Sequence, residues 1–256
     1  MKLGKVAGVI ISIVAAILAL ILLLNYGQRA REIDFMIEKI NLTTSDDVKI
    51  VGSLYPVSNP KEWLFLVHMM PATKESWKDF ATAMQKEKYE SIAIDLRGHG
   101  ESDGGPNGYQ KFSDTEHQVS IQDLMAAWEF LKSRGATPDK LTVIGASIGA
   151  NLSLQFLIKN PEVQRGVLLS AGDYRGLDSG HLVGKLRLNQ KVLFVASKKD
   201  DRAAGNNAVQ NQQYYDSAPT SDKQLILYES AGHGTDLLGF SEKPDLTEAI
   251  KEFLMK

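Results

Sequence analysis

A serine with a glycine two positions away on each side interrupts an apolar stretch near the middle of the chain. In LTVIGASIGANLSL, residues 141–154, Ser147 lies between Gly145 and Gly149, after a β-branched run and before residues that favour helices. In a strand-to-helix turn, such glycines relieve crowding and expose the serine hydroxyl. That hydroxyl could act as a nucleophile if a neighbouring base takes its proton. The plain alternative is a glycine-rich turn with an ordinary serine.

His233 is the best candidate for the base among the five histidines of the chain. It lies in ESAGHGTDLL, just past the last predicted strand. Ligands of open α/β sheets bind beyond the carboxyl ends of the strands, so this position suits a reacting group. His68 and His99 are expected to fix loops by hydrogen bonds. His117 and His181 fall in polar stretches and are expected to be solvated.

A carboxylate should hold the tautomer of the histidine. KVLFVASKKDDRAA offers Asp200 and Asp201 after the penultimate predicted strand, and LLSAGDYRG offers Asp173. Surface salt bridging or helix capping is the alternative role for each of these three residues.

The elements that must position these residues follow an alternating pattern. From Ile33 onward, short apolar runs alternate with amphipathic stretches, which indicates about eight mostly parallel strands covered by helices on both faces. FMIEKINLTT and VKIVGSLYPV predict an antiparallel hairpin, joined at residues 45–47. Further strands are predicted in WLFLVHMM, ESIAIDLRG, KLTVIG, QRGVLLSAG, KVLFVAS and KQLILYES. Helices are predicted in ESWKDFATAMQKEK, TEHQVSIQDLMAAWEFLKSRG, ANLSLQFLIKN, NNAVQNQQYYDS and DLTEAIKEFLMK.

The composition excludes several other classes of protein. The net charge is −2 and no lysine and arginine cluster is present, so no nucleic-acid partner is expected. The chain has no cysteine, which removes disulfides, thiolate zinc sites and a cysteine nucleophile. It lacks an H-E-x-x-H motif, and GASIGANL lacks the lysine of a P-loop. RGHGESDGG has Asp103 where G-x-G-x-x-G needs its last glycine. No metal and no cofactor are expected.

The N-terminus carries a long apolar stretch. Val6 to Leu24 has no charged residue, and at ~1.5 Å per residue it would cover roughly 28 Å, about the hydrocarbon core of a bilayer. We expect an uncleaved single-pass anchor. A cleaved signal peptide is disfavoured because residues 25–29, NYGQR, form a poor cleavage site. A buried core helix is the remaining alternative.

This anchor predicts two parts, with residues 1–30 as membrane anchor and linker and residues 31–256 as one folded domain. Lysines 2 and 5 precede the apolar stretch and arginines 29 and 31 follow it, so the positive-inside bias nearly cancels. The expected orientation has the N-terminus inside and the domain extracytoplasmic.

Two motifs resemble those of the α/β-hydrolase superfamily. Residues 95–102, DLRGHGES, resemble the family's D-x-R-G-H-G-x-S turn. Residues 197–200, SKKD, are similar to its G-x-x-D, with serine in place of glycine, and this favours Asp200 over Asp201. The likeness extends over nearly everything after the anchor, and the order Ser147, Asp200, His233 is the family's order of nucleophile, acid and histidine.

The resemblance implies an α/β-hydrolase fold and a membrane-anchored serine hydrolase acting on a small-molecule acyl substrate. Ser147 would attack the carbonyl, His233 would serve as general base and then acid, and Asp200 would orient His233. A carboxylic ester is the expected substrate, with a thioester or an amide as alternatives, and no cofactor is implied. A non-catalytic interaction protein of the same fold is the alternative from another class.

One departure from the family concerns the oxyanion hole. Many relatives have His-Gly after the third strand, whereas this chain has His68-Met69-Met70-Pro71. By position, the resemblance implies the backbone N–H groups of Met70 and Ile148 as donors, with Met69 as the alternative to Met70. Loss of one donor would cost roughly 3 kcal/mol of transition-state stabilisation.

The site is expected to be open. Only about twenty residues, GDYRGLDSGHLVGKLRLNQ, lie where the family often inserts a helical cap, so a large lid is not expected. Met69, Met70 and Trp77 are candidates to line the pocket, with core packing as the alternative for all three.

Overall fold

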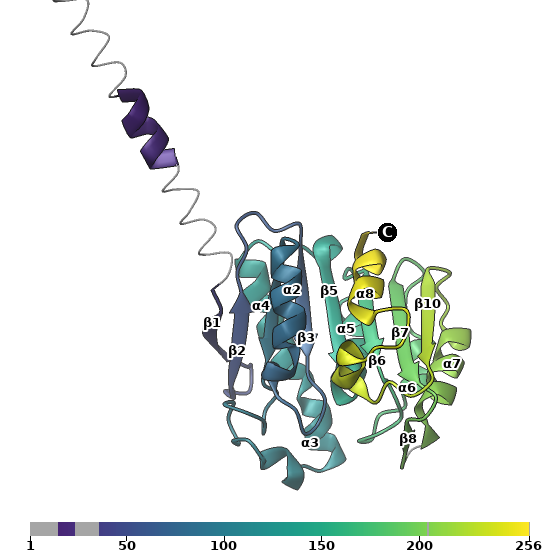
Figure 1. Ribbon diagram of the computed structural model, residues 1–256. Coiled ribbons are helices and arrows are strands. Elements are labelled where there is room, and N and C mark those ends of the chain that lie inside the picture. The colour runs from purple at the N-terminus through teal and green to yellow at the C-terminus, as the bar shows by residue number, and fades with distance from the viewer. Residues whose placement is uncertain (1–14, 24–35, 204, 256) are drawn as a thin grey trace, which may run out of the picture.

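The computed structural model describes residues 15–23, 36–203 and 205–255 (Figure 1). An eight-stranded sheet forms its centre, with the strands in the order β1-β2-β4-β3-β5-β6-β7-β10. The strands of this sheet are β1 (Glu38–Thr43), β2 (Lys49–Tyr55), β3 (Glu62–Val67), β4 (Tyr89–Ile94), β5 (Leu141–Ala146), β6 (Arg165–Leu169), β7 (Lys191–Ser197) and β10 (Lys223–Tyr228). β2 pairs antiparallel with both of its neighbours and all other pairs are parallel, which confirms the predicted hairpin and the mostly parallel sheet.

Helices cover both faces of the sheet (Figure 1). The helices of the domain are α2 (Lys78–Lys86), α3 (Asp114–Val119), α4 (Ile121–Ser133), α5 (Ile148–Lys159), α6 (Ser179–Val183), α7 (Asn207–Ser217) and α8 (Leu246–Met255). The short 3-10 turns are η1 (Lys74–Trp77), η2 (Gly108–Lys111), η3 (Pro138–Lys140) and η4 (Gly234–Gly239). Side chains of α4, α5, α6 and α7 join one buried apolar cluster, whereas those of α2 and α8 join a second on the opposite face.

The central strand β3 shows why the sheet has two cores. Side chains of a strand alternate between its faces. Phe65 and Val67 accordingly pack into the first cluster, and Leu64 and Leu66 pack into the second. Because β3 is covered on both sides, its sequence is a continuous apolar run rather than an alternating one.

The long helix predicted in TEHQVSIQDLMAAWEFLKSRG is wrong in one respect, since it is divided into α3 and α4 at Ser120. The Ser120 N–H donates to the His117 carbonyl, and the Asp123 N–H donates to the Ser120 carbonyl. At that point, hydrogen bonds between residues three apart replace the α-helical hydrogen bonds between residues four apart.

The prediction for His117 is also wrong, because its ring is buried. His117 is 3% exposed and packs edge-on against Phe112, with ring centroids 5.5 Å apart. The polar neighbours on α3 face solvent while this one position of the helix turns inward. His181 is exposed, as predicted.

The predicted anchor from Val6 to Leu24 lies partly outside the described residues. Residues 15–23 are helical and exposed. Among the residues the structure describes, no helix combines the length and apolar character needed to cross a bilayer.

Between β6 and β7 the chain forms only the short helix α6, so no cap domain covers the carboxyl edge of the sheet there.

Candidate active site

Ser147 lies in a strained turn between β5 and α5. Its backbone has φ 54° and ψ −118°, a conformation that residues other than glycine rarely adopt. A Cβ on Gly145 would lie 2.1 Å from the Gly149 carbonyl oxygen, and a Cβ on Gly149 would lie 2.3 Å from the Val67 carbonyl oxygen. Both glycines are therefore required by close backbone contacts. The turn has the geometry of a nucleophile elbow.

Asp200 and His233 meet at the carboxyl ends of β7 and β10. The Nδ1 of His233 lies 2.5 Å from Oδ2 of Asp200. A ring that donates from Nδ1 keeps Nε2 as an acceptor, which is the tautomer a general base needs. Burial raises the pKa of Asp200, but the hydrogen bonds and charges of His233 and Arg202 outweigh it and lower that pKa. The carboxylate is therefore ionised at neutral pH.

The other two candidate carboxylates make different contacts. Asp201 is exposed, and its side chain accepts a hydrogen bond from Nδ2 of Asn206 at 2.8 Å. Asp173 accepts from the Ser179 N–H at 2.7 Å and from the Tyr214 hydroxyl at 2.8 Å. Asp173 therefore bonds the N–H of the first residue of α6, the helix whose N-cap is Asp178, which is close to the helix-capping role given as its alternative.

Ser147 and His233 open onto one cavity of about 650 Å³. Its lining residues are Met70, Pro71, Tyr109, Asp114, Ser147, Tyr174, Arg175, Arg202, Ala203 and His233. Among the described residues no hydrogen bond joins Ser147 Oγ to His233; the polar contact of Ser147 Oγ is with the Tyr174 hydroxyl at 3.5 Å. That contact is long for a hydroxyl pair. The Tyr174 hydroxyl donates instead to the Ser170 carbonyl at 2.5 Å.

Of the residues expected at the oxyanion hole, Met70 lines this cavity, and Ile148 directly follows Ser147. Ile148 is the first residue of α5, so its N–H has no acceptor within the helix and lies at the positive end of the helix dipole. Met70 lines the cavity, whereas Met69 packs with the second core cluster and lies close to Gly234. Trp77 is fully buried in the core, so core packing is its role.

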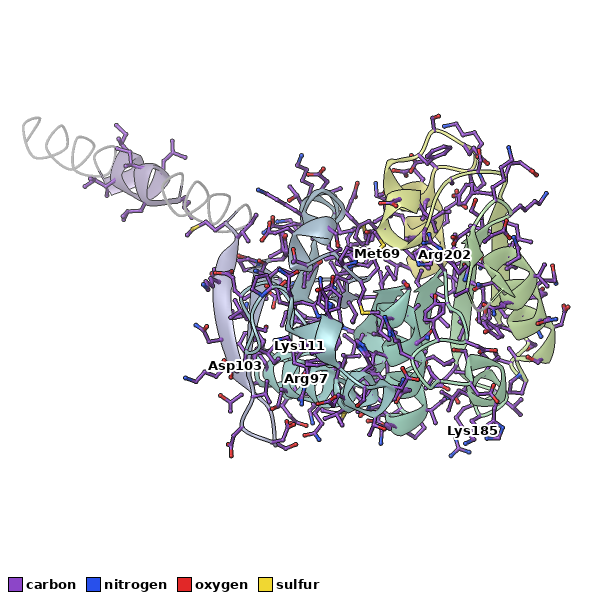
Figure 2. The ribbon with its side chains drawn as sticks, turned by 90° about the horizontal axis from the view of Figure 1, so that it is seen from below. Met69, Arg97, Asp103, Lys111, Lys185 and Arg202 are labelled. Atoms are coloured by element: carbon purple, nitrogen blue, oxygen red, sulfur yellow. The ribbon has the colours of Figure 1, made fainter. Side chains whose placement is uncertain are left out.

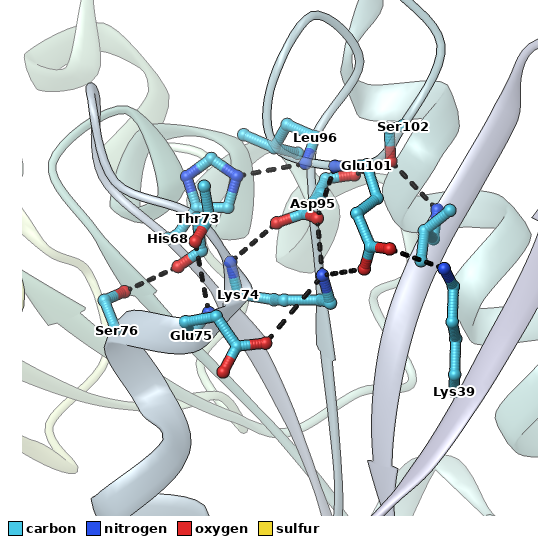
Figure 3. Close-up of polar contacts among 11 residues, drawn as sticks. Lys39, His68, Thr73, Lys74, Glu75, Ser76, Asp95, Leu96, Glu101 and Ser102 are labelled. Atoms are coloured by element: carbon cyan, nitrogen blue, oxygen red, sulfur yellow. Dashed lines mark hydrogen bonds and ion pairs between the residues drawn. The ribbon is translucent and has the colours of Figure 1, made fainter. Parts of the chain in front are cut away.

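A buried ion pair holds the loop that carries Met69 and Met70 (Figure 3). The Lys74 Nζ lies 2.7 Å from Asp95 Oδ2, and the Lys74 backbone N–H donates to Asp95 Oδ1 at 2.8 Å. A third contact, 2.8 Å long, joins Lys74 Nζ to Glu101 Oε2. Burial alone would lower the pKa of Lys74, but the two carboxylates raise it. The loop after β3 is thus clamped to the turn after β4 by charged groups.

His68 adds a second link between the same two loops. Its Nε2 accepts from the Leu96 N–H at 3.0 Å, and its Nδ1 bonds the Met69 carbonyl at 2.8 Å. Burial and the neighbouring His99 lower the pKa of His68 to about 3, so the ring is neutral. His99 bonds the Arg97 carbonyl through Nδ1 and stacks on Tyr109 at 4.2 Å. The predicted loop-fixing roles of His68 and His99 are confirmed.

Two residues of the site were not found from the sequence. Tyr174 contacts Ser147. Arg202, which is labelled in Figure 2, bonds Asp200 and lines the cavity. The available signal was position alone, since Tyr174 follows β6 and Arg202 lies two residues after Asp200.

Within the described residues, no cluster of three or more histidine or carboxylate side chains could hold a metal ion.

Comparison with known proteins agrees with this fold. A 133-residue segment is 32% identical to a Bacillus subtilis protein named "Putative 2-succinyl-6-hydroxy-2,4-cyclohexadiene-1-carboxylate synthase" and covers 52% of this chain. A 112-residue segment is 26% identical to a Cyberlindnera fabianii protein named "Probable alcohol acetyltransferase" and covers 43% of this chain. The matches span 44% and 27% of those two proteins, less than half of either length.

A solved structure and a family model extend the comparison over more of the chain. The esterase Pf2001 of Pyrococcus furiosus is 20% identical, with a TM-score of 0.69 over 88% of this chain and 94% of its own, which shows a shared fold. Residues 58–188, just over half of the chain, match the Hydrolase_4 model, described as serine aminopeptidase, S33. The chain therefore belongs to this family of hydrolases and has the α/β-hydrolase fold.

Proposed function

We propose that the protein is a serine hydrolase that cleaves carboxylic esters of small acyl substrates. One observation carries the proposal: Ser147, in its strained turn, lines the same cavity as His233, and His233 bonds the buried carboxylate of Asp200. A hydroxyl, an imidazole and a carboxylate in this order are the groups that acyl transfer through a covalent intermediate requires.

The mechanism assigns one role to each group. Ser147 Oγ attacks the substrate carbonyl carbon as His233 Nε2 takes its proton, and Asp200 holds the imidazole and stabilises its positive charge. The backbone N–H groups of Ile148 and Met70, or of Met69 in place of Met70, donate to the tetrahedral oxyanion. His233 then protonates the leaving group. Water, activated by the same imidazole, releases the acyl group from Ser147.

Other reactions of serine hydrolases differ from ester hydrolysis in the bond that is cleaved or in the molecule that accepts the acyl group. The family description names an aminopeptidase, which cleaves amides, and one relative is named an alcohol acetyltransferase, in which an alcohol accepts the acyl group. An ester is the leading choice because the structural neighbour Pf2001 is named an esterase, and the cavity of about 650 Å³, with no cap domain over it among the described residues, has room for a small acyl group. Thioester and amide substrates belong in the same assay panel.

Labelling with a fluorophosphonate probe, mapped by mass spectrometry, tests the nucleophile directly. We expect an adduct on Ser147 that is lost in Ser147→Ala and His233→Ala. Ser153→Ala is the matched control, because Ser153 is a fully buried serine on α5, the helix that begins after Ser147. Labelling of Ser147 should persist in this variant. Hydrolysis of short p-nitrophenyl esters should follow the labelling. A folded protein that takes no label would contradict the proposal and favour a non-catalytic interaction protein.

The proposed function includes a membrane anchor in residues 1–30, with residues 31–256 as an extracytoplasmic catalytic domain. Its support is the uncharged stretch from Val6 to Leu24, which is long enough to span a bilayer. The full chain should sediment with membranes and resist extraction at alkaline pH, whereas a version lacking residues 1–30 should be soluble. Protease accessibility in intact cells checks the orientation. A full chain found free of the membrane would contradict the anchor.

A further inference from the structure

The two carboxylate oxygens of Asp200 have different partners. Oδ2 lies 2.5 Å from His233 Nδ1, and Oδ1 accepts from Nε of Arg202, also at 2.5 Å. Among the described residues, these are the hydrogen bonds that the Asp200 carboxylate makes. Rotation of this carboxylate about its Cβ–Cγ bond is therefore set by His233 on one side and Arg202 on the other.

A small hairpin holds Arg202 in place. Arg202 ends β8 (Asp201–Arg202), which pairs antiparallel with β9 (Gly205–Asn206). Asn206 donates from Nδ2 to the Lys198 carbonyl and to Asp201 Oδ1, both at 2.8 Å. The Arg202 side chain is 47% exposed and lines the cavity. Its guanidinium thus touches the buried carboxylate from the solvent side of the cavity.

The charge of Arg202 has two opposing effects on the proposed reaction. A guanidinium keeps Asp200 ionised and oriented, which helps the carboxylate to hold His233. The same positive charge repels the imidazolium that forms when His233 takes the proton from Ser147. Among the described residues, the other titratable groups near the pair are Tyr174, whose pKa burial raises to about 12, Asp236 in η4, and Arg175 and Asp114 on the cavity wall.

We infer that Arg202 is a positioning residue for the Asp200–His233 pair, orienting the carboxylate while its positive charge opposes the charge that develops on the imidazole in the proposed reaction. The inference rests on the proposed serine hydrolase function. It differs from a substrate-binding role, because Arg202 acts through Asp200 and not through contact with the acyl group.

The pH dependence of kcat/KM on a neutral ester separates the charge from the geometry. Arg202→Gln removes the charge but keeps a donor, so the repulsion between position 202 and a positively charged imidazole is lost, and the acid limb of the pH profile should move up by about half to one pH unit. Arg202→Lys keeps the charge and loses the planar guanidinium. The acid limb of its pH profile should therefore stay within about 0.2 pH unit of the wild type, while kcat falls about 10-fold. KM should change less than about 2-fold in both variants, since neither variant removes a ground-state substrate contact.

Lys198→Gln is the matched control, because it removes a cation from the same loop. Lys198 is 51% exposed and pairs with Glu229 rather than with Asp200. Its pH profile should match that of the wild type. The ring proton of His233 Nδ1, followed by proton NMR, gives a readout besides activity, and it should shift in both Arg202 variants but not in Lys198→Gln.

The outcomes separate the two proposals. If the wild type takes no fluorophosphonate label on Ser147, the proposed function fails. If the wild type is labelled and active while Arg202→Gln keeps the wild-type acid limb, kcat and ring-proton signal, only the role of Arg202 is overturned. A rise in KM with kcat unchanged would make Arg202 a substrate-binding residue and would also overturn it.

Discussion

Asp95 and Asp200 are buried carboxylates that follow strands of the same sheet, but their cations differ in exposure. Lys74, which pairs with Asp95, has a side chain 6% exposed, whereas Arg202, which pairs with Asp200, is 47% exposed. Removing one partner of a buried ion pair is costly, whereas a solvated partner is screened and can be changed at less cost. The loop with the proposed oxyanion donor Met70 or Met69, here called the oxyanion side, is thus held by a buried clamp. The proposed acid, here called the acid side, is held by a partner that water reaches.

The largest expected effect is on the acid side. Asp200→Asn keeps the volume of the side chain but removes its charge and favours the wrong tautomer of His233, so kcat should fall on the order of 10⁴-fold. Asp201→Asn is the matched control, since this exposed neighbour bonds Asn206 rather than His233 and its amide oxygen can still accept that bond, and its kcat should stay within about 2-fold of the wild type. Steady-state ester hydrolysis measures both. Equal losses in the two variants would contradict the assignment of Asp200.

The oxyanion side should show its largest effect in stability. Lys74→Met leaves Asp95, which is 0% exposed, without its cation, and should lower the free energy of unfolding by about 3 kcal/mol. Lys39 pairs with Glu101 of the same clamp, and its side chain is 57% exposed, so Lys39→Met should cost under about 1 kcal/mol. Urea denaturation compares the two variants. Similar costs would show that burial does not distinguish these charges.

Gly149→Ala tests whether activity depends on the close contact between the Ser147 turn and the loop after β3. The new Cβ would lie 2.3 Å from the Val67 carbonyl oxygen and 2.6 Å from that of His68, so the elbow and the β3 loop must move apart. A displacement of this kind should lower kcat on the order of 10²-fold. Gly239→Ala meets nothing within 4 Å and serves as the control. Unchanged kcat in Gly149→Ala would mean that the contact is not needed for activity.

The smallest effect concerns a partly exposed ion pair outside the site, between Arg97 and Asp46. The Arg97 hydrogen bond lowers the pKa of Asp46 from 3.8 to about 2, and the Asp46 side chain is 34% exposed. A lowered pKa contributes stability above pH 3.8 that is lost as pH falls through 2. After solvent screening this amounts to under about 1 kcal/mol. Asp46→Asn should be less stable than wild type near neutral pH, and the difference should shrink below about pH 3 in urea denaturation. Asp47→Asn, at the exposed next position, should show no such change.

Much of the fold could be predicted because its signals are local. The continuous apolar run of β5 and the helix formers of α5 are short-range patterns, and Gly145 is dictated by a steric contact within the turn itself, with the Gly149 carbonyl oxygen. Gly149, by contrast, is required by the carbonyl oxygens of Val67 and His68, which come from another strand and its loop. The hairpin and the mostly parallel sheet followed from the same patterns. The break at Ser120 was missed because apolar spacing continues across it, and the burial of His117 was missed because its neighbours are polar.

The sequence by itself therefore determined the strands, the helices and the strained serine turn, because each depends on residues adjacent in the chain. The tertiary structure alone decided which charges meet. Asp200 contacts His233 across 33 positions, and Lys74 reaches Asp95 across 21. Arg202 is close to Asp200 in the chain, yet its place beside the cavity depends on how the hairpin packs on the sheet edge. Such pairings depend on strand order and on burial, which no local pattern encodes.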